Sequence, residues 1–374
     1  MTNPGLYIHI PFCASRCSYC AFCSGIYHAE KATRYLECLA EEMERIPGKS
    51  FSTVFIGGGT PSVLSLSQLS TLLSLIPAGD YEEFTIECNP DSISREKLSL
   101  FSNGGVTRIS FGAQTFSSRG LSLLGRRHDA GTAAKAIEMA VKMPFRSCSI
   151  DLISAWPGET LGELESDIDQ AVSLGVKHVS CYTLIPEEGT PLGDDILAGK
   201  ITEMGDVEAR EFWDCAEAAL AGYGFTHYET SNFSLAGFEC RHNVNCWKGH
   251  EYVGLGVSAH SHMVGRRFAN TSDLAEYFLL IESGDSAESE SEQLDTDRKA
   301  RETAVFWLRL AEGIDVEEFA KRNGVSIYDL YREELPRLIE MNNLEFYTRS
   351  SGKTYLRITA EFYPLADMVL TELV

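Results

Sequence analysis

The sequence contains no apolar run long enough to cross a bilayer. Its N-terminal region also lacks the basic stretch and the continuous apolar segment of an export signal, because His9 and Pro11 interrupt the only apolar stretch there. Positive charge is scarce as well: 32 Lys and Arg residues stand against 54 Asp and Glu residues, a net charge of −22. These absences predict a cytoplasmic protein without a membrane span, and they argue against binding to nucleic acid.

A disulfide framework is also absent, since the eleven cysteines are odd in number and scattered along the chain. Four of them are crowded into the segment LYIHIPFCASRCSYCAFCS at residues 6–24, as Cys13, Cys17, Cys20 and Cys23. Crowded thiolates can converge on one metal centre. Structural zinc would usually require a second Cys or His pair, and none is nearby. The Cys-x3-Cys-x2-Cys spacing therefore predicts an iron–sulfur cluster with three protein ligands and one open iron.

Strand-like segments alternate with amphipathic helical patterns through the first half of the chain. The predicted strands are 6–10, 53–56, 84–88, 108–112, 148–153 and 178–184. Six β-α units with right-handed crossovers build a parallel sheet, but eight are needed to close an ordinary barrel. We therefore expect the α/β class, with an open, partial (β/α)6 barrel.

The rest of the chain suggests a less regular extension and a smaller domain. We expect a barrel domain over 1–281 that includes an irregular extension from about 198 to 281. Residues 282–297 contain seven acidic residues and no Lys or Arg, which is typical of a solvated linker. Residues 298–374 show three helical patterns and then two strands around a turn at 350–353, which resembles an α+β winged-helix module. This module carries more acidic than basic residues, so a DNA-reading regulatory role is disfavoured.

Polar and glycine signals follow the carboxyl ends of the predicted strands, where barrels of this kind place their sites. The cysteine loop follows the first strand, and Gly58, Gly59 and Thr60 follow the second. The later strands contribute Glu87, Gln114 and Asp151. A simpler interpretation stays open for each: a tight turn for the glycines, loop capping for the polar side chains, and a packed pair for Tyr7 and His9.

Several motifs together resemble a known superfamily. They are YIHIPFC, FIGGGTPS, IECNPD, RISFGAQT, LGRRH, IDLI and FECRHNVNCWKGHEYVGLG, in chain order. The set resembles the radical S-adenosylmethionine superfamily, and more closely the oxygen-independent coproporphyrinogen III oxidase family with its heme-chaperone branch. The resemblance covers nearly the whole chain. It implies that Cys13, Cys17 and Cys20 ligate a [4Fe-4S] cluster and that S-adenosylmethionine occupies the fourth iron.

The resemblance also implies roles for other residues. Tyr7 and His9 would be catalytic residues near the cluster and substrate, and Tyr7 would also contact the cofactor. Gly58, Gly59 and Thr60 would present backbone to the methionine end of S-adenosylmethionine. The remaining polar contacts to that cofactor would come from Glu87, Gln114, Arg126 and Asp151. Cys23 lies one residue later than the extra cysteine of the oxidases, so a free thiol and a conditional ligand both remain open.

The segment 241–247 carries the signal that separates the subfamilies. The chaperone branch has His-Asn-x-x-Tyr-Trp there, and this chain has His242, Asn243 and Trp247 with Cys246 in the Tyr position. The resemblance implies His242 as a heme ligand. Cys246, His260 and His262 are alternative ligands, and a purely structural His242 is a further interpretation.

The resemblance implies a heme chaperone that delivers heme to apo-hemoproteins such as respiratory enzymes, with an external electron donor for the cluster. The alternative is coproporphyrinogen III oxidation, in which an adenosyl radical initiates decarboxylation of propionates to vinyl groups. Only six residues precede Tyr7, whereas the oxidases carry an extension there, which favours the chaperone. Whether the chain also turns over coproporphyrinogen as an enzyme stays open at this point.

Overall fold

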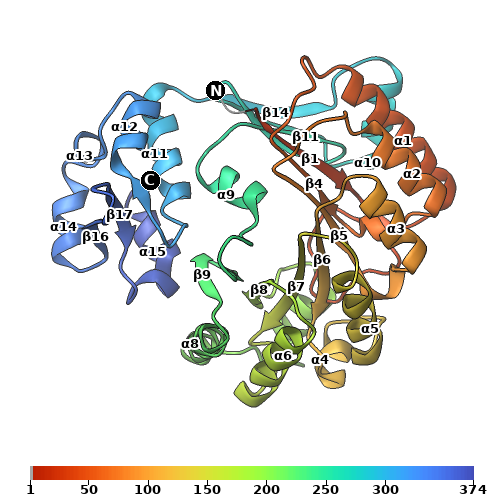
Figure 1. Cartoon of the computed structure of the whole chain (residues 1–374), viewed down its shortest axis with the longest axis horizontal. Coiled ribbons are helices and arrows are strands. Elements are labelled where there is room, and N and C mark those ends of the chain that lie inside the picture. Colours follow the sequence, from red (N-terminus) through yellow and green to blue (C-terminus); the bar gives the residue numbers. More distant parts are fainter. Residues whose placement is uncertain (1–2) are drawn as a thin grey trace.

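The computed structural model describes residues 3–374, and six parallel strands form the centre of its main sheet. They are neighbours in chain order: β1 (Gly5–Ile10), β4 (Thr53–Gly58), β5 (Glu83–Cys88), β6 (Arg108–Gln114), β7 (Ser147–Ser154) and β8 (His178–Thr183). These strands coincide with the six predicted ones to within two residues at each end, so the predicted partial (β/α)6 barrel is confirmed (Figure 1).

Helices cover the outer face of these strands (Figure 1). They are α1 (Ala29–Glu44), α2 (Leu66–Leu75), α3 (Arg95–Asn103), α5 (Ala130–Val141) and α6 (Leu161–Ser173). Shorter pieces lie in the connections: β2 (Phe12–Cys13), β3 (Gly25–Ile26), α4 (Ser118–Leu123) and the 3-10 turns η1 (Pro61–Val63) and η2 (Pro90–Ser92). Ser65 is the N-cap of α2 and forms a complete capping box with Gln68.

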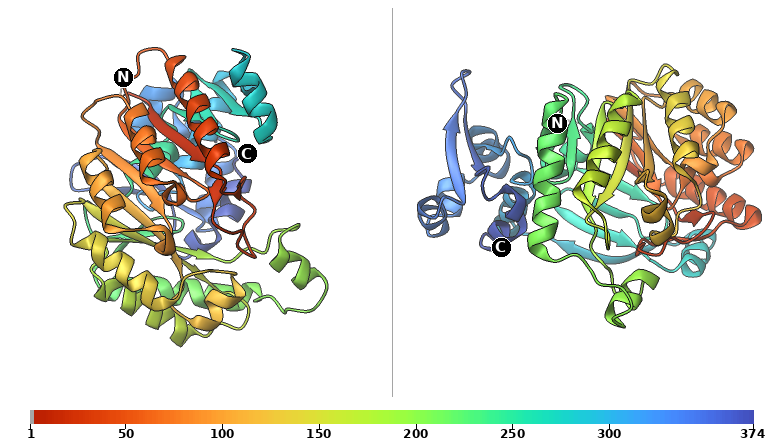
Figure 2. Two further views of the ribbon diagram at one scale, coloured as in Figure 1. Left: turned by 90° about the vertical axis from the view of Figure 1, so that its right-hand side faces the viewer. Right: turned by 90° about the horizontal axis from the view of Figure 1, so that it is seen from below.

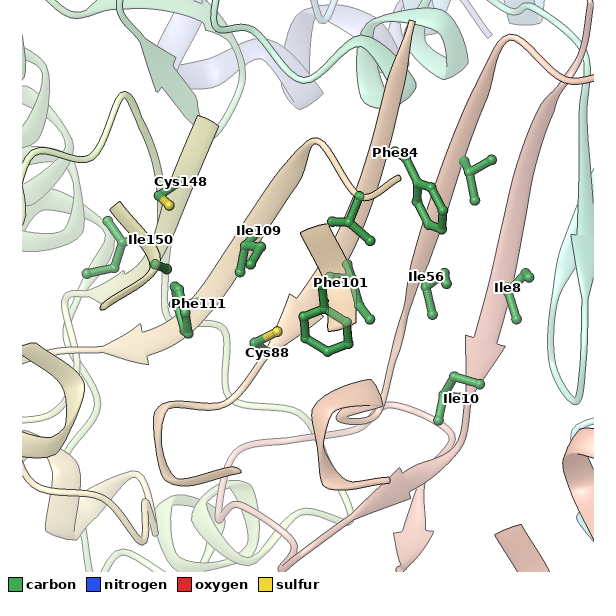
Figure 3. Close-up of a cluster of buried hydrophobic side chains, with 14 of the residues drawn as sticks. Ile8, Ile10, Ile56, Phe84, Cys88, Phe101, Ile109, Phe111, Cys148 and Ile150 are labelled. Carbon is green, nitrogen blue, oxygen red and sulfur yellow. The ribbon is translucent and has the colours of Figure 1, made fainter. Parts of the chain in front are cut away.

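The two faces of the barrel strands differ in chemistry, because successive side chains of a strand point to opposite faces. The outer set is apolar and packs beneath the helices; Figure 3 shows Ile8, Ile56, Phe84, Ile109, Phe111 and Ile150 in this core. The inner set is polar or small, as in Arg108, Ser110 and Gly112 along β6. The sequence thus builds a dry layer outside the barrel and a polar lining inside it, and the lining forms the site.

The sheet continues beyond both ends of the barrel. Next to β1 lie β11 (Tyr252–Leu255), β12 (His260–Met263), β13 (Arg266–Asn270) and β14 (Glu288–Gln293); next to β8 lie β10 (Asn232–Ser234) and β9 (Thr226–Glu229). The helices of this part are α7 (Pro191–Leu197), α8 (Asp206–Gly222), α9 (Arg241–Trp247) and α10 (Leu274–Glu282). The α7 segment projects from the body of the molecule (Figure 2). The extension that we predicted as irregular therefore consists of helices together with short strands that join the main sheet.

The acidic segment 282–297 differs from its predicted role as a linker. Its central part forms the edge strand β14, which pairs antiparallel with β13. All but the first of its six side chains are exposed, so the carboxylates stay in water while the backbone pairs. Composition describes side chains, whereas strand pairing is made by backbone groups, and for this reason the acidic pattern concealed the strand.

The C-terminal part has a separate hydrophobic core. It contains α11 (Thr296–Trp307), β15 (Ile314–Asp315), α12 (Val316–Asn323), α13 (Ile327–Leu330), α14 (Glu334–Glu340), β16 (Leu344–Thr348), β17 (Thr354–Ile358), η3 (Tyr363–Leu365) and α15 (Ala366–Thr371). The hairpin expected around 350–353 joins β16 to β17. None of the helices formed by residues 3–374 combines the length and the apolar character that a membrane span requires.

Candidate functional site

One cavity at the mouth of the barrel gathers ten of the predicted site residues. It has a volume of about 140 Å³. Its lining includes Cys13, Cys17, Cys20, Gly58, Gly59, Thr60, Glu87, Gln114, Arg126 and Asp151. They come from the cysteine loop after β1, from the ends of β4 to β7, and from the loop after α4. Parallel strands bring their carboxyl ends to one edge, which explains why residues so far apart in the chain meet here.

Two hydrogen-bond donors point at the cysteine sulfurs. The Arg126 Nη1 group donates to Cys17 Sγ over 3.2 Å, and the Thr60 hydroxyl donates to Cys13 Sγ over 3.5 Å. The guanidinium is half-buried and is fixed by bonds to Asn89 and to the carbonyl of Gly112. Hydrogen-bond donors around metal-bound sulfur are a usual feature of iron–sulfur sites. The donor set therefore fits a thiolate-ligated cluster.

The arrangement of the thiols distinguishes a cluster from a single ion. Within residues 3–374, no three His, Cys, Asp or Glu side chains are close enough to bind one metal ion together. In a [4Fe-4S] cluster each thiolate binds a different iron, so the three sulfurs need only surround the same space. Thiols around one cavity therefore suit an iron–sulfur cluster better than zinc.

Cys23 is turned away from this cavity. Its Sγ lies 3.4 Å from the carbonyl oxygen of Ser272, just before α10, and its own carbonyl accepts a hydrogen bond from His9 Nε2 over 2.8 Å. It does not belong to the cavity lining formed by the other three cysteines. In this conformation Cys23 closes the loop against the barrel as a free thiol.

The glycines after β4 are required by packing. Gly58 has a φ of +104°, and a Cβ there would lie 2.5 Å from the ring of His9. At Gly59 a Cβ would lie 2.9 Å from the carbonyl oxygens of Ile10 and Phe12. The N–H groups of Gly58, Gly59 and Thr60 already donate to Glu87, Ile10 and Phe12. These residues thus offer space for a ligand and no free N–H donor, so their predicted backbone contact with the cofactor would be made through other groups and stays a prediction.

Tyr7 and His9 form a hydrogen-bonded pair behind the cavity. The Tyr7 hydroxyl lies 3.0 Å from His9 Nδ1, and burial lowers the pKa of His9. Neither residue belongs to the cavity lining; His9 reaches it only through its contact with Gly58. The packed-pair interpretation fits this conformation better than direct contact with a substrate.

Two buried carboxyl groups and one strained glutamine complete the cavity. Burial, together with the nearby Asp151 charge, raises the pKa of Glu87 to about 8. Burial also raises the pKa of Asp151, which accepts a hydrogen bond from Ser110 over 3.1 Å. Gln114 has a φ of +70° at an irregularity in the pairing of β6 with β7. Such strain in a non-glycine residue is typical of functional sites.

A second cavity of about 310 Å³ extends deeper into the barrel. It shares Glu87, Gln114 and Asp151 with the first, so the two are adjacent. Its floor is formed by Arg108 and His178, at the amino ends of β6 and β8, and by Asn243 of α9. None of these floor residues was predicted from the sequence as a site residue. The inward-pointing alternation along β6 could have identified Arg108, four residues before Gly112.

His242 lies at the opposite end of the strands from the cysteines. Its Nδ1 is 2.9 Å from the Thr53 hydroxyl at the start of β4, and its ring packs against Phe55 and Gly5. It is 6% exposed, and burial lowers its pKa to about 4. It lines neither barrel cavity. A ligand as large as heme therefore has no access to His242 unless α9 moves.

The alternative ligands differ in environment. Burial raises the pKa of the Cys246 thiol to about 12. His260 is exposed, whereas His262 is buried and its Nε2 has no hydrogen-bond partner within residues 3–374. None of the three lines either barrel cavity.

Comparison with known proteins places the chain in a family. The radical SAM superfamily matches residues 7–171. The protein named heme chaperone HemW from Bacillus subtilis is 34% identical over 343 residues, 89% of this chain and 90% of that protein. The HemW of Lactococcus lactis is 34% identical over 342 residues, 90% of each.

The structural comparison agrees in fold. The solved structure of coproporphyrinogen III oxidase (HemN) from Escherichia coli, described as a radical SAM enzyme, has a TM-score of 0.86 at 21% sequence identity, covering 100% of this chain and 90% of that one. A likeness at this identity concerns the fold. With the sequence relatives, it establishes that the chain belongs to the HemW family of radical SAM proteins.

Proposed function

We propose that this chain is a cytoplasmic heme chaperone that binds heme and transfers it to apo-hemoproteins such as respiratory enzymes. The observation that carries the proposal is the 34% identity to proteins named heme chaperone HemW, over about nine-tenths of both chains. An alignment of that extent includes the barrel and most of the remainder of the chain. The similarity therefore extends beyond the barrel and is not limited to one domain.

The barrel mouth supports a [4Fe-4S] cluster and S-adenosylmethionine, which membership of the radical SAM superfamily implies. Cys13, Cys17 and Cys20 would ligate the cluster, and Glu87, Gln114, Arg126, Asp151 and the turn at Gly58, Gly59 and Thr60 would surround S-adenosylmethionine. When bound, the cluster supplies an electron, taken from an external donor, that cleaves a carbon–sulfur bond of S-adenosylmethionine. The protein's part is to orient the cofactor: Arg126 fixes Cys17, while Glu87 is fixed by the amide of Gly58.

His242 is the iron ligand that we propose, through Nε2. A metal-binding histidine is usually oriented by a partner on its other ring nitrogen, and the Thr53 hydroxyl contacts Nδ1 in this way. The low pKa of His242 keeps the imidazole neutral, which is the form that binds a metal. Because the ring is buried, heme binding at His242 requires α9 to move away from the barrel floor.

Heme titration of the reconstituted protein tests this assignment. We expect a stable Soret band in the wild type and at least tenfold weaker heme binding in His242→Ala. The matched control is His260→Ala, which removes an exposed histidine and leaves the affinity unchanged. An unchanged Soret band in His242→Ala would show that another residue binds the heme iron. Cys246 and His262 would then be substituted next.

The oxidase alternative is tested in a parallel assay. Anaerobic protein is supplied with dithionite, S-adenosylmethionine and coproporphyrinogen III. The chaperone proposal predicts no protoporphyrinogen. Appearance of that product, with loss of carbon dioxide, would instead make the chain a porphyrinogen-decarboxylating enzyme. The two assays together also identify a protein that does both.

A further inference from the structure

The deeper barrel cavity contains a buried positive charge that the chain does not neutralise by a direct contact. Arg108 is 3% exposed and lines this cavity from the amino end of β6. Its Nη1 makes two long hydrogen bonds, to the Ser147 hydroxyl at 3.4 Å and to the Phe238 carbonyl at 3.3 Å. Its Nε is buried and has no partner within residues 3–374. Burying a guanidinium with so few partners costs folding free energy, because the hydrogen bond that Nε makes to water in the unfolded chain is not replaced.

The nearest candidate for a counter-charge is engaged elsewhere. The Glu83 carboxylate accepts from the backbone N–H groups of Arg241 and His242 and from the thiol of Cys240. It therefore serves the start of α9, and it makes no hydrogen bond to Arg108 within the described residues. Arg108 is left with donor capacity directed towards the cavity that it lines.

The cavity is polar at one end and apolar at the other. Arg108, His178 and the Asn243 amide form the floor, whereas Phe22, Leu184 and Ile185 lie at the mouth. Phe22 and Ile185 are each 70% exposed, an unusual position for large apolar side chains. The lining follows β8 from its first residue to its last, roughly 17 Å at about 3.3 Å per residue.

The carboxyl groups nearer the mouth lie on other levels of the barrel than Arg108. Glu87 pairs in register with Ser110, two residues along β6 from Arg108, and Asp151 pairs with Gly112, four residues along. The backbone of Asp151 is therefore about 13 Å from the level of Arg108 along the strands. The Asp151 side chain still interacts electrostatically with the guanidinium, but an anion at the floor contacts Arg108 and not the carboxyl groups.

From this arrangement we propose that the barrel cavity is a binding site for an amphipathic carboxylic acid, with the carboxylate on Arg108 and Asn243 and the apolar body directed towards Phe22 and Ile185. A guanidinium binds a planar carboxylate through paired N–H donors, which suits this partner better than a neutral one. The cavity volume is at the lower end of the range for small-molecule sites. It admits a small acid, or one acidic side arm of a larger apolar ligand.

The inference is independent of heme binding at His242, which lies outside this cavity. The two possible sources of the carboxylate are separated by the choice of probe. Octanoate represents a free acid, and protoporphyrin IX represents an acidic arm on a larger body; the second probe alone depends on the proposed function. The methyl ester of each acid removes the charge and keeps the apolar body.

Calorimetric titration of the full-length, cluster-reconstituted protein tests the site. We expect at least one acid to bind, its ester to bind at least tenfold more weakly, and Arg108→Met to weaken binding of the acid at least tenfold. The matched control is Arg146→Met, because Arg146 donates to the neighbouring carbonyl of Gly237 but is exposed and lies outside the cavity. This control should bind like the wild type.

A second variant tests the site independently in case Arg108→Met does not fold. Ile185→Asp alters an exposed residue at the mouth, so folding is preserved, and it should weaken binding several-fold by removing apolar contact and adding negative charge. Binding of octanoate alone identifies a free acid as the ligand class, and binding of protoporphyrin IX alone identifies an acidic arm. The proposal is overturned if neither acid binds, if the esters bind as tightly, or if both variants retain wild-type affinity.

Discussion

At the scale of single residues, the site divides into groups that face the mouth cavity and groups that support them. Cys13, Cys17 and Cys20 face it, whereas Cys23 is directed to the carbonyl of Ser272. Arg126 and Thr60 donate to two of the three sulfurs. The spacing of four cysteines in the sequence does not distinguish these roles, but the direction of each side chain does.

The cysteines give the first prediction at this scale. Cys17→Ala should abolish the brown absorbance and the electron paramagnetic signal of the reduced cluster, because it removes the thiolate that Arg126 stabilises. Cys23→Ala is the matched control, from the same loop, and should retain both signals. The measurement is anaerobic reconstitution followed by absorption and resonance spectra. Retention of both signals in Cys17→Ala, or their loss in Cys23→Ala, would overturn the ligand assignment.

Much of the mouth cavity could be predicted from the sequence, because its residues follow the strand ends. The floor could be predicted only in part. The alternation along β6 indicates an inward-facing Arg108, but its meeting with His178 and Asn243 depends on α9 reaching the barrel from a distant part of the chain. The family resemblance implies that Tyr7 and His9 lie near the cluster and substrate; neither lines the cavity in this conformation, and their catalytic role stays a prediction.

At the scale of elements, α9 depends on a residue of β5. Glu83 is the first residue of that strand. Its carboxylate accepts hydrogen bonds from the first two N–H groups of α9, a helix more than 150 positions later in the chain. Helix starts need such acceptors, since their N–H groups lack partners within the helix. A short helix whose N-terminus is bound by another element is positioned by the barrel itself.

The dependence of α9 on Glu83 gives the second prediction. Glu83→Gln should lower the local stability of α9 by about 1 to 3 kcal/mol, because two backbone donors lose a charged acceptor. Amide hydrogen exchange over residues 241–247 measures this. Glu82→Gln is the control, since Glu82 is largely exposed and contacts Arg241 only by a surface ion pair. Equal exchange in both variants would show that Glu83 does not position α9.

The elements outside the barrel show where sequence patterns fail. The six barrel strands are continuous, mostly apolar on one face, and bounded by helices, so their periodicity is plain. The strands β11 to β14 are short and rich in His, Arg, Ser and Glu. They are stabilised by backbone pairing with β1 and with one another, and backbone pairing leaves no apolar pattern in the side chains.

At the scale of the whole molecule, α9 lies between the barrel and the C-terminal domain (Figure 1), and side chains join it to that domain. Trp247 lies 6.1 Å from Phe306 between ring centroids, with Arg309 over its face. Arg322 of α12 donates to the carbonyls of Lys248 and Gly249, at 2.8 and 3.2 Å, directly after α9. The helix that carries His242 is thus fixed at its start by the barrel and at its end by the C-terminal domain.

With His242 as the proposed heme ligand, this double attachment predicts how heme would reach it. Since the ring is buried, α9 must move before heme binds, and the bonds from Arg322 oppose that movement. Arg322→Ala should therefore speed heme association, by roughly tenfold if about 1.4 kcal/mol of restraint is lost. Stopped-flow measurement of the Soret change gives the rate. Arg332→Ala is the control, because Arg332 is exposed and bonds only to Asp329 in its own domain. Identical rates in wild type and Arg322→Ala would mean that heme enters without release of α9, and the ligand would then have to be a residue other than His242.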